Sequence, residues 1–393
     1  MIEKNALTSN VLVLDGMWNK TLAVVRSLGS RGLTLTVGEH TRFAAALFSK
    51  YCARAVVYPS PLGSPPAFIE WLLKEVSTTR YDMVMPAEYE TLRIILKHRT
   101  ELEKYTRLPF GDLNLISNLH DKAWLLRSAM GKGFPCPKTI FTQGKDAPAI
   151  AKEADGLGYP LVIKPRESSG SRGFVYVPEK KPFFSEYKSV NSKYPFPLIQ
   201  EFIPNGGAFG VGALFNFKGV PRAAFVYKRL REYPVSGGPS TLRESVKDET
   251  LKDLGLEILK SLKWTGLGMV EFRVDARTGK PVLMEINPRP WGSLHLAVMS
   301  GMDFPYLLDR LAVDNDIAPQ WDYKAGVRCR WLIPGDLMHL ASNALRFKAS
   351  PGFFKGSDHD DIISFKDPLP LVGRLLSFLP FIYDKEMRRL LLR

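Results

Sequence analysis

Residues 269–289, MVEFRVDARTGKPVLMEINPR, are the stretch from which the fold of this chain can be predicted. Two runs of alternating apolar residues flank the turn sequence DARTG, a pattern typical of a β-hairpin. Pairing Asp275 with Pro281 across the turn places Glu271 opposite Glu285 on the neighbouring strand. We therefore predict that two carboxylates lie side by side on one face of this hairpin.

The face that carries Glu285 also carries Asn287 and Arg289, because alternate side chains of a strand point the same way. Neighbouring carboxylates repel each other unless a cation lies between them. Two glutamates and an asparagine form an all-oxygen set, which suits Mg2+ better than zinc. Arg289, one step further along, is placed to hold a phosphate oxygen. A hairpin with its charges on a solvated face is the plain alternative.

Composition limits the class of protein. The 393 residues are enough for two or three domains, at ~150 residues each. An apolar content of 45% with 24% charged residues is ordinary for a globular enzyme. The formal net charge of +14 implies attraction to anions without saying which anions. Because no zinc-finger spacing, RNA-binding aromatic signature or long Lys/Arg run occurs, nucleic acid is not expected as a partner.

The cysteines and the N-terminal residues bear on the compartment. Cys52, Cys136 and Cys329 are widely spaced, without a CxxC motif or a histidine partner pattern, so neither a disulfide framework nor a zinc site is expected. The first residues, MIEKNALTSN, lead into the strand-like VLVLDG without the apolar stretch of a signal peptide. A reducing cytoplasm fits these features best.

The apolar tail at residues 369–383, LPLVGRLLSFLPFIY, contains Arg374 and is shorter than the ~20 residues of a spanning helix. With MRRLLLR following, one interpretation is peripheral association with an anionic membrane, at its inner face. The other interpretation is a helix packed on the parent domain. Both interpretations stay open, as does the oligomeric state.

Residues 11–115 alternate strand-like and helix-like segments, which predicts a parallel sheet with crossover helices. The first strand is not followed by GxGxxG, so a dinucleotide site is disfavoured. Ligands of open parallel sheets usually bind beyond the carboxyl ends of strands, which makes Asp15 and Glu88 candidates for ligand contacts. Either residue would serve equally well as a helix cap.

Lys164 ends the apolar strand YPLVIKP and is followed by the small-residue loop ESSGSRG. Glycine lets backbone N–H groups approach oxygens closely, and lysine supplies a point charge, so this arrangement suits a phosphate. The loop is not GxxxxGK[ST] and so is not a P-loop. A plain hairpin turn is the alternative at this position.

Four elements follow one another along the chain: Asp121-Lys122 at a helix start, Lys164 with its loop, the run LIQEFIP, and the carboxylate hairpin. Their order and the hairpin spacing closely resemble the ATP-grasp superfamily, which includes D-alanine–D-alanine ligase, biotin carboxylase and carbamoyl phosphate synthetase. The resemblance covers roughly residues 10 to 310. It implies an α/β and α+β fold with a parallel-sheet preATP-grasp domain, a small lid and a large metal-binding subdomain. The boundaries we expect are 1–115, 116–203 and 204–315, followed by an extension of unknown architecture at 316–393.

The resemblance assigns roles to the nucleotide side. Lys122 and Lys164 would hold the phosphates of ATP, and the flexible loop would close over them. The loop residues concerned are Ser168, Ser169, Gly170, Ser171 and Gly173, and the hinge residues that would bind adenine are Gln200, Glu201, Phe202 and Ile203. Because Pro204 lacks an N–H, the donor to adenine should be Ile203 and the acceptor the Glu201 carbonyl. The acidic ribose contact of many relatives has no obvious counterpart in NGGAFGVG.

On the metal and substrate side, Glu271, Glu285 and Asn287 would bind one or two Mg2+ ions, with Mn2+ also compatible. Arg289 would steady the transferring phosphoryl group. Residues 228–241, KRLREYPVSGGPST, resemble the substrate loop of carboxylate–amine ligases. The substrate contacts expected are Glu88, Arg231, Ser236, Gly237 and Gly238, with Arg231 also catalytic through a substrate carboxylate or acyl phosphate. The alternative is an exposed basic turn.

The function implied by the resemblance is an ATP-dependent ligase that joins a small-molecule carboxylate to an amine through an acyl phosphate, releasing ADP and phosphate. A synapsin-like, ATP-binding protein that associates with membranes without making a product is the alternative. The intact Glu/Glu/Asn/Arg set weighs against it, because a pure binding module has little use for phosphoryl-transfer chemistry.

Overall fold

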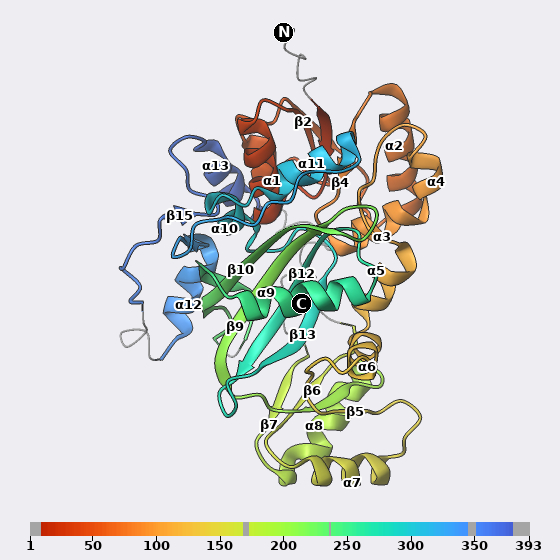
Figure 1. Cartoon of the computed structure of the whole chain (residues 1–393), viewed down its shortest axis with the longest axis vertical. Helices are drawn as coiled ribbons and strands as arrows, with labels where there is room; N and C mark the ends of the chain where they lie inside the picture. Colours follow the sequence, from red (N-terminus) through yellow and green to blue (C-terminus); the bar gives the residue numbers. More distant parts are fainter. Residues whose placement is uncertain (1–8, 168–172, 236, 345–350, 380–393) are drawn as a thin grey trace.

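The computed structural model describes residues 9–167, 173–235, 237–344 and 351–379. Within these residues, three β-sheets follow one another along the long axis of the molecule (Figure 1). The N-terminal sheet lies at one end, a small four-stranded sheet at the other, and a seven-stranded sheet between them. The predicted fold class, α/β together with α+β, is confirmed.

The N-terminal sheet is parallel throughout, as the alternation of strand and helix signals predicts, with the strand order β3-β2-β1-β4. Its strands are β1 (Asn10–Val13), β2 (Thr34–Glu39), β3 (Arg54–Val57) and β4 (Met83–Met85). The helices of this region are α1 (Asn19–Ser30), η1 (Ala45–Phe48), α2 (Pro65–Thr78), α3 (Tyr89–Lys97) and α4 (Arg99–Leu102). Val11, Leu12 and Val13 are completely buried, as expected for the central strand of a sheet covered on both faces.

Two helices, α5 (Leu113–His120) and α6 (Lys122–Gly131), lead from the N-terminal sheet to the small sheet. Asp121 caps α6, because its side chain accepts a hydrogen bond of 2.9 Å from the backbone N–H of Ala123. The same carboxylate forms an ion pair with Arg166, which follows the strand that ends in Lys164. This pair brings the start of α6 to the end of that strand.

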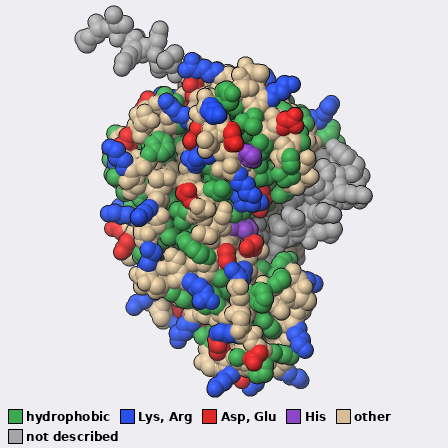
Figure 2. All heavy atoms as spheres, turned by 90° about the vertical axis from the view of Figure 1, so that its right-hand side faces the viewer, with side chains coloured by type: hydrophobic (Ala, Val, Ile, Leu, Met, Phe, Trp, Pro, Cys, Tyr) green, Lys and Arg blue, Asp and Glu red, His purple; other side chains and the backbone are tan. Residues whose placement is uncertain are grey.

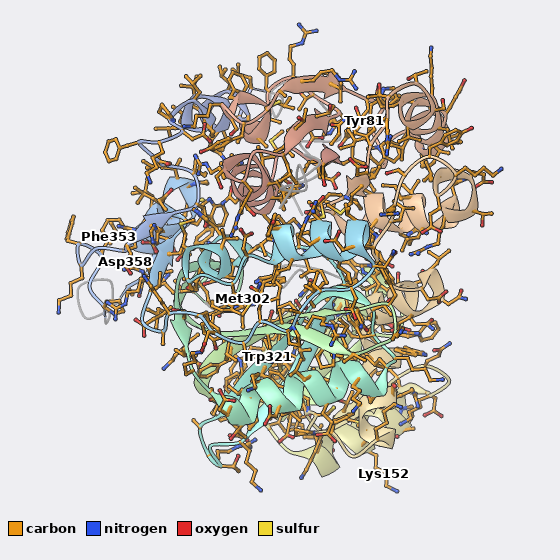
Figure 3. All side chains as sticks on the ribbon, turned by 45° about the horizontal axis from the view of Figure 1, so that its top comes forward. Tyr81, Lys152, Met302, Trp321, Phe353 and Asp358 are labelled. Atoms are coloured by element: carbon orange, nitrogen blue, oxygen red, sulfur yellow. The ribbon has the colours of Figure 1, made fainter. Side chains whose placement is uncertain are left out.

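The small sheet is antiparallel, in the order β5-β8-β6-β7. Its strands are β5 (Thr139–Phe141), β6 (Leu161–Lys164), β7 (Val175–Val177) and β8 (Leu198–Glu201). Two helices, α7 (Ala147–Leu157) and α8 (Lys180–Lys193), pack on it and form a separate apolar core. Lys152 of α7 points outward at the far end of this unit (Figure 3).

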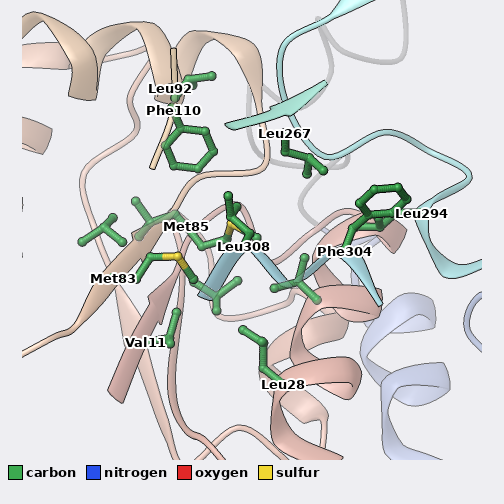
Figure 4. Close-up of a cluster of buried hydrophobic side chains, with 14 of the residues drawn as sticks. Val11, Leu28, Met83, Met85, Leu92, Phe110, Leu267, Leu294, Phe304 and Leu308 are labelled. Atoms are coloured by element: carbon green, nitrogen blue, oxygen red, sulfur yellow. The ribbon is translucent and has the colours of Figure 1, made fainter. Parts of the chain in front are cut away.

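The seven-stranded sheet has the order β13-β12-β9-β10-β11-β14-β15. Its long strands are β9 (Asn205–Phe215), β10 (Pro221–Glu232), β11 (Ser240–Val246), β12 (Gly266–Asp275) and β13 (Pro281–Asn287). One face packs on α9 (Glu249–Ser261). The other packs on α10 (Leu294–Met299), α11 (Phe304–Asp314) and the N-terminal sheet. Figure 4 shows this second core, in which Val11 and Met83 of the N-terminal sheet lie with Leu267 of β12 and Phe304 of α11.

The architecture of the C-terminal region, left open by the sequence, is an edge added to the central sheet. Its elements are β14 (Arg328–Arg330), η2 (Leu332–Asp336), α12 (Leu337–Ser342), β15 (His359–Asp360) and α13 (Leu369–Leu376). Phe353 and Asp358 lie at the outer edge of the molecule, on the segment between α12 and β15 (Figure 3). Helix α13 packs closely on η1, since a Cβ at Gly373 would lie 2.6 Å from the ring of Phe48. In the part of the chain that the structure describes, no helix is long and apolar enough to cross a membrane.

Candidate active site

The hairpin β12–β13 forms as predicted, and Glu271 pairs with Glu285. Near the turn the expected register is wrong by one residue, because Pro281 pairs with Val274 rather than with Asp275. A β-bulge after Glu271 absorbs the difference, so that the two carboxylates still face each other. The amide of Asn287 donates a hydrogen bond of 2.9 Å to Glu285 Oε1, which makes the three predicted metal ligands one contiguous group.

The two carboxylates differ in their surroundings. Burial raises the pKa of Glu271 to about 7, against the lowering effect of Arg229, with which it forms an ion pair. Burial also opposes the ionisation of Glu285, but Lys122, Asn287 and Arg229 outweigh it and its pKa is lowered. Such a buried, negatively charged oxygen group is a binding site for a hard divalent cation.

Two lysines, from α6 and from the small sheet, face these carboxylates. Lys122 is the first residue of α6, and Lys164 is the last residue of β6. Burial and, after it, the neighbouring cations Arg273 and Lys122 lower the pKa of Lys164 to about 8, while the glutamates oppose the shift. Burial also lowers the pKa of Lys122, again against the attraction of Glu285. Two buried ammonium groups beside two carboxylates form a site suited to a metal-bound polyphosphate.

A cleft that is partly open to solvent lies between the small sheet and the central sheet. Its charged lining residues are Lys122, Lys164, Glu201, Arg229, Glu232, Glu271, Arg273 and Glu285. Its apolar lining residues include Leu126, Val162, Phe174, Leu198, Ile203, Phe272 and Met284. This combination suits a ligand with one flat apolar part and one highly charged part.

The predicted hinge, residues 200–203, lines the same cleft. The backbone N–H of Glu201 donates to the Lys138 carbonyl, and that of Phe202 donates to the Pro160 carbonyl. Among the described residues, no acceptor is found for the N–H of Ile203, which leaves this group available as the predicted donor. The Glu201 carboxylate pairs with Arg277 at 3.1 Å, so this side chain braces the hinge against the hairpin turn.

Arg231 is not in the cleft, contrary to the prediction. Its side chain is 4% exposed and forms an ion pair with Asp336 at 2.9 Å. A β-bulge between Arg229 and Arg231 shifts the pairing of β10 with β11 and turns Arg231 toward η2. Arg229 lines the cleft instead. The sequence analysis did not predict this role, because nothing in the sequence KRLRE indicates a bulge between the two arginines.

The remaining predicted loop residues divide into two groups. Gly237 and Gly238 line the cleft, and Gly173 has a φ of 69°, which only glycine adopts easily. A Cβ at Gly173 would also lie 2.6 Å from the Pro165 side chain, so a larger residue at this position would displace its neighbours. Ser168, Ser169, Gly170, Ser171 and Ser236 lie outside the described residues.

Glu88 and Arg289 lie beside the cleft rather than among its lining residues. Glu88 forms an ion pair of 2.5 Å with Lys20, a buried residue of α1 that the sequence did not single out. Burial and, after it, the nearby Arg289 lower the pKa of Lys20 to about 8, whereas Glu88 opposes the shift. Arg289 also contributes to the lowered pKa of Glu285, so its charge acts on a metal ligand as well as on Lys20.

Asp15 has a structural role, which settles the choice between cap and ligand. Its carboxylate accepts hydrogen bonds from the N–H groups of Ala87 and Glu88 at 2.8 and 2.7 Å, and from the Thr91 hydroxyl at 2.7 Å. Burial raises its pKa to about 6. Asp15 therefore fixes the start of α3, and with it Glu88.

A second cluster of potential metal donors lies away from the cleft. His295, Cys329 and Asp361 are buried, with Cys329 Sγ 3.3 Å from Asp361 Oδ1 and His295 Nδ1 3.5 Å from the same oxygen. Arg243, also buried, forms an ion pair with that oxygen. Because the guanidinium already supplies the positive charge, we interpret this cluster as an ion-pair network rather than a metal site.

Sequence comparison gives partial matches. Residues 222–333 match a family described as ATP-grasp in the biosynthetic pathway with Ter operon. The chain is similar to a D-alanine–D-alanine ligase of Thermoanaerobacter sp., with 26% identity over 233 residues, 52% of this chain and 62% of the relative. It is also similar to a formate-dependent phosphoribosylglycinamide formyltransferase of Ignicoccus hospitalis, with 26% identity covering 58% of this chain and 59% of the relative. The chain thus spans about three fifths of the length of these curated relatives.

Structural comparison covers more of the chain. A biotin carboxylase complex from Campylobacter jejuni has a TM-score of 0.68 at 17% identity, covering 81% of this chain and 74% of that chain. An N5-carboxyaminoimidazole synthetase from Staphylococcus aureus has a TM-score of 0.61 at 16% identity, covering 81% and 80%. At these identities the likeness is one of fold. Residues 222–333 are thus similar to an ATP-grasp family, and the chain as a whole shares its fold with a biotin carboxylase.

Proposed function

We propose that the protein is an ATP-dependent ligase, using Mg2+ or Mn2+, that joins a small-molecule carboxylate to an amine and releases ADP and phosphate. The observation that carries this proposal is the meeting of Lys122 and Lys164 with Glu271 and Glu285 in one cleft. The curated relatives support it, since they include a D-alanine–D-alanine ligase. Solved neighbours with the same fold include a biotin carboxylase domain in complex with MgADP.

The chain's own residues divide the work. Residues 200–203 would hold the base, and Lys122 and Lys164 the phosphates. Glu271, Glu285 and Asn287 would hold the divalent cation, which when bound neutralises phosphate charge and polarises the transferring phosphoryl group. Arg229 orients Glu271 through its ion pair and favours the charged form of this carboxyl against the effect of burial. Gly237 and Gly238 line the same cleft, where the Gly237 N–H already donates to the Pro234 carbonyl.

The reaction has two steps in this proposal. A carboxylate oxygen of the substrate attacks the terminal phosphorus, the bond to the bridging oxygen breaks, and ADP leaves. The amine nitrogen then attacks the acyl carbon, the acyl C–O bond breaks, and phosphate leaves with loss of a proton from nitrogen. Arg289 is placed to offset charge in the first step, and the small sheet with its loop would exclude water.

The test is a substrate screen. Purified full-length protein is supplied with ATP, Mg2+ and a library of amino acids and amino sugars, and phosphate release is measured. Phosphate release that requires both a carboxylate and an amine supports the ligase. Tight ATP binding with no turnover across a broad library would favour the synapsin-like alternative instead.

Lys164 gives a quantitative prediction. Lys164→Ala removes a buried charge-assisted contact to phosphate, which should cost about 1.5–3 kcal/mol of ATP binding, or about ten- to a hundredfold in Kd. Calorimetric titration with MgADP and MgATP measures this. Lys152→Ala, an exposed change on α7, is the matched control and should leave both affinities unaltered. Equal affinities of Lys164→Ala and wild type would move the phosphates elsewhere.

The same lysine should make binding depend on pH. The pKa of Lys164 is about 8 without ligand, and bound phosphate favours the ammonium, so its pKa in the complex is higher. Below the pKa of the ligand-free protein, Lys164 is already protonated and its contribution to ATP affinity is fully present. Above about pH 8, binding must take up a proton and affinity should fall with rising pH by up to about tenfold per unit. Lys164→Ala should lose this slope.

For the compartment we propose the cytoplasm, and for partners only small-molecule substrates. Basic and acidic side chains are interspersed on the face shown in Figure 2, with no single basic patch there of the kind that nucleic-acid binding needs.

Peripheral membrane association is a second candidate, favoured by one observation. Leu369, Val372 and Leu375 lie along the outer side of α13 and are 56, 46 and 53% exposed, and Phe365 beside them is fully exposed. This apolar row, on a chain of net charge +14, suits an anionic membrane surface. Arg374 does not contribute to this row, because its side chain turns inward to the carbonyl of Met17.

The membrane prediction can be tested without disturbing the inner side of α13. Wild-type protein should co-sediment with phosphatidylserine-containing vesicles, and the triple change Leu369→Ser, Val372→Ser and Leu375→Ser should abolish this. Raising salt should weaken binding only in part, because each basic residue contributes about 1 kcal/mol and the apolar side chains supply the remainder. No sedimentation of wild type at any salt concentration would remove the membrane candidate.

A further inference from the structure

We call the part of the proposed active site that would bind the carboxylate and amine substrates its acceptor half. One short loop leads to the predicted substrate contact Glu88, through the partner of that residue. Residues 14–18 connect β1 to α1, whose second residue is Lys20, the partner of Glu88. Arg289 lies near enough to this pair and to the metal ligands for its charge to lower the pKa of both Lys20 and Glu285. We call Lys20, Glu88 and Arg289 the acceptor triad.

Arg374 of α13 reaches this loop from the other end of the chain. Its Nη2 donates a hydrogen bond of 3.0 Å to the Met17 carbonyl and a second one to Asn19 Oδ1. Burial lowers the pKa of Arg374 to about 10, so the guanidinium is still protonated at neutral pH. The two bonds fix the end of the loop that leads into α1 and Lys20.

The segment that carries Arg374 is itself tied to α1. Arg26 donates to the backbone carbonyls of Asp361, Ile362 and Asp367 at 3.1, 2.7 and 2.9 Å. The Asp367 carboxylate accepts from the Ser49 hydroxyl at 2.8 Å and from the Lys50 N–H at 2.9 Å. These contacts fix residues 361–367 on the N-terminal region.

The same segment is also tied to the central sheet. Asp361 forms an ion pair with Arg243 of β11, and its Oδ2 lies 3.5 Å from Asn19 Nδ2. The preceding strand β15 pairs with β14 at the edge of the sheet whose other edge is the metal-binding hairpin. One segment thus touches the loop before Lys20 and the sheet that carries Glu271.

We propose that residues 359–379 form part of the acceptor half of the active site, with Arg374 as a positioning residue that sets Lys20 and Glu88 against Arg289. The proposal rests on the function proposed above, and assigns to the C-terminal segment control of acceptor binding rather than of nucleotide binding. The segment touches neither the hinge nor Lys164, so nucleotide affinity should not depend on it.

The experiment compares Arg374→Gln, Arg374→Lys and the control Arg80→Gln, an exposed arginine after α2, in the full-length protein. Amide hydrogen exchange of residues 16–20, MgADP affinity, and the KM and kcat for the substrates found by the screen are measured. In Arg374→Gln we expect exchange of residues 16–20 about tenfold faster, acceptor KM raised about tenfold with kcat within about threefold, and MgADP affinity unaltered. Lysine can still donate to Met17, so Arg374→Lys should recover part of the KM.

Other outcomes would overturn the positioning role. Exchange that rises over the whole N-terminal sheet together with lower Tm, and with equal losses in MgADP affinity and kcat, would show a general structural role. Unaltered exchange at residues 16–20 and unaltered KM would show that Arg374 has no role in the loop. If wild-type protein turns over no substrate pair, the proposed ligase function fails separately, and the local exchange still decides whether Arg374 holds the loop.

Discussion

Glu285→Gln is expected to abolish ATP turnover while leaving the protein folded, with a loss on the order of 10³-fold or more in kcat. The glutamine keeps the shape of the side chain and can still contact Asn287, whose amide lies 2.9 Å from Glu285 Oε1. It removes the charge that offsets the cation, in a group where Lys122 already holds Glu285 ionised. ADP release is measured with the substrate pair that supports wild-type turnover.

The control for this change is Glu257→Gln, which removes a carboxylate from the exposed side of α9. It should leave turnover and Tm unaltered. A Glu285→Gln protein that releases ADP at near wild-type rate would show that the hairpin is not the catalytic centre.

Arg229→Gln should mainly lower turnover and Arg231→Gln should mainly lower stability, although only one residue separates the two positions. Arg229 pairs with Glu271 in the cleft, so its loss leaves a buried carboxylate without its partner and should lower kcat by on the order of 10²-fold. Arg231 pairs with Asp336 away from the cleft, so its loss should cost about 1–3 kcal/mol of stability. Turnover per folded molecule of Arg231→Gln should stay within about threefold of wild type.

Denaturant unfolding and steady-state kinetics on both variants separate these effects. Arg229→Lys keeps the positive charge but lacks the planar guanidinium with its paired N–H donors. Its activity should therefore lie between those of Arg229→Gln and wild type. If Arg231→Gln proves inactive but fully stable, the assignment of Arg231 to the substrate would be right and the cleft assignment of Arg229 wrong.

The parts of the site that were predictable lie where local sequence fixes geometry. The turn DARTG and the alternation on either side of it predict the hairpin, and the predicted pairing of Glu271 with Glu285 holds because a bulge after Glu271 compensates for the one-residue register difference near the turn. The position of Lys122 follows from the helix cap Asp121, and that of Lys164 from the end of an apolar strand. The cleft brings both lysines to the hairpin.

The parts that were missed depend on contacts between distant segments. A bulge in β10 decides which arginine enters the cleft, and nothing in its sequence marks the bulge. Lys20 has no motif, and its role follows only from the pairing with Glu88, sixty-eight positions away in the chain. The C-terminal region likewise folds as an edge of a sheet formed by residues far earlier, with Asp361 and Arg374 contacting β11 and the β1–α1 loop.

The central claim is that the nucleotide lies in the cleft between the small sheet and the central sheet, and a crystal structure grown with Mg2+ and ADP tests it most directly. The account predicts the base against residues 200–203 with the Ile203 N–H as donor, and the phosphates between Lys122 and Lys164. The metal should be bound to Glu285 and Asn287. Nucleotide bound at another place on the protein, or an empty cleft at saturating MgADP, would contradict the account.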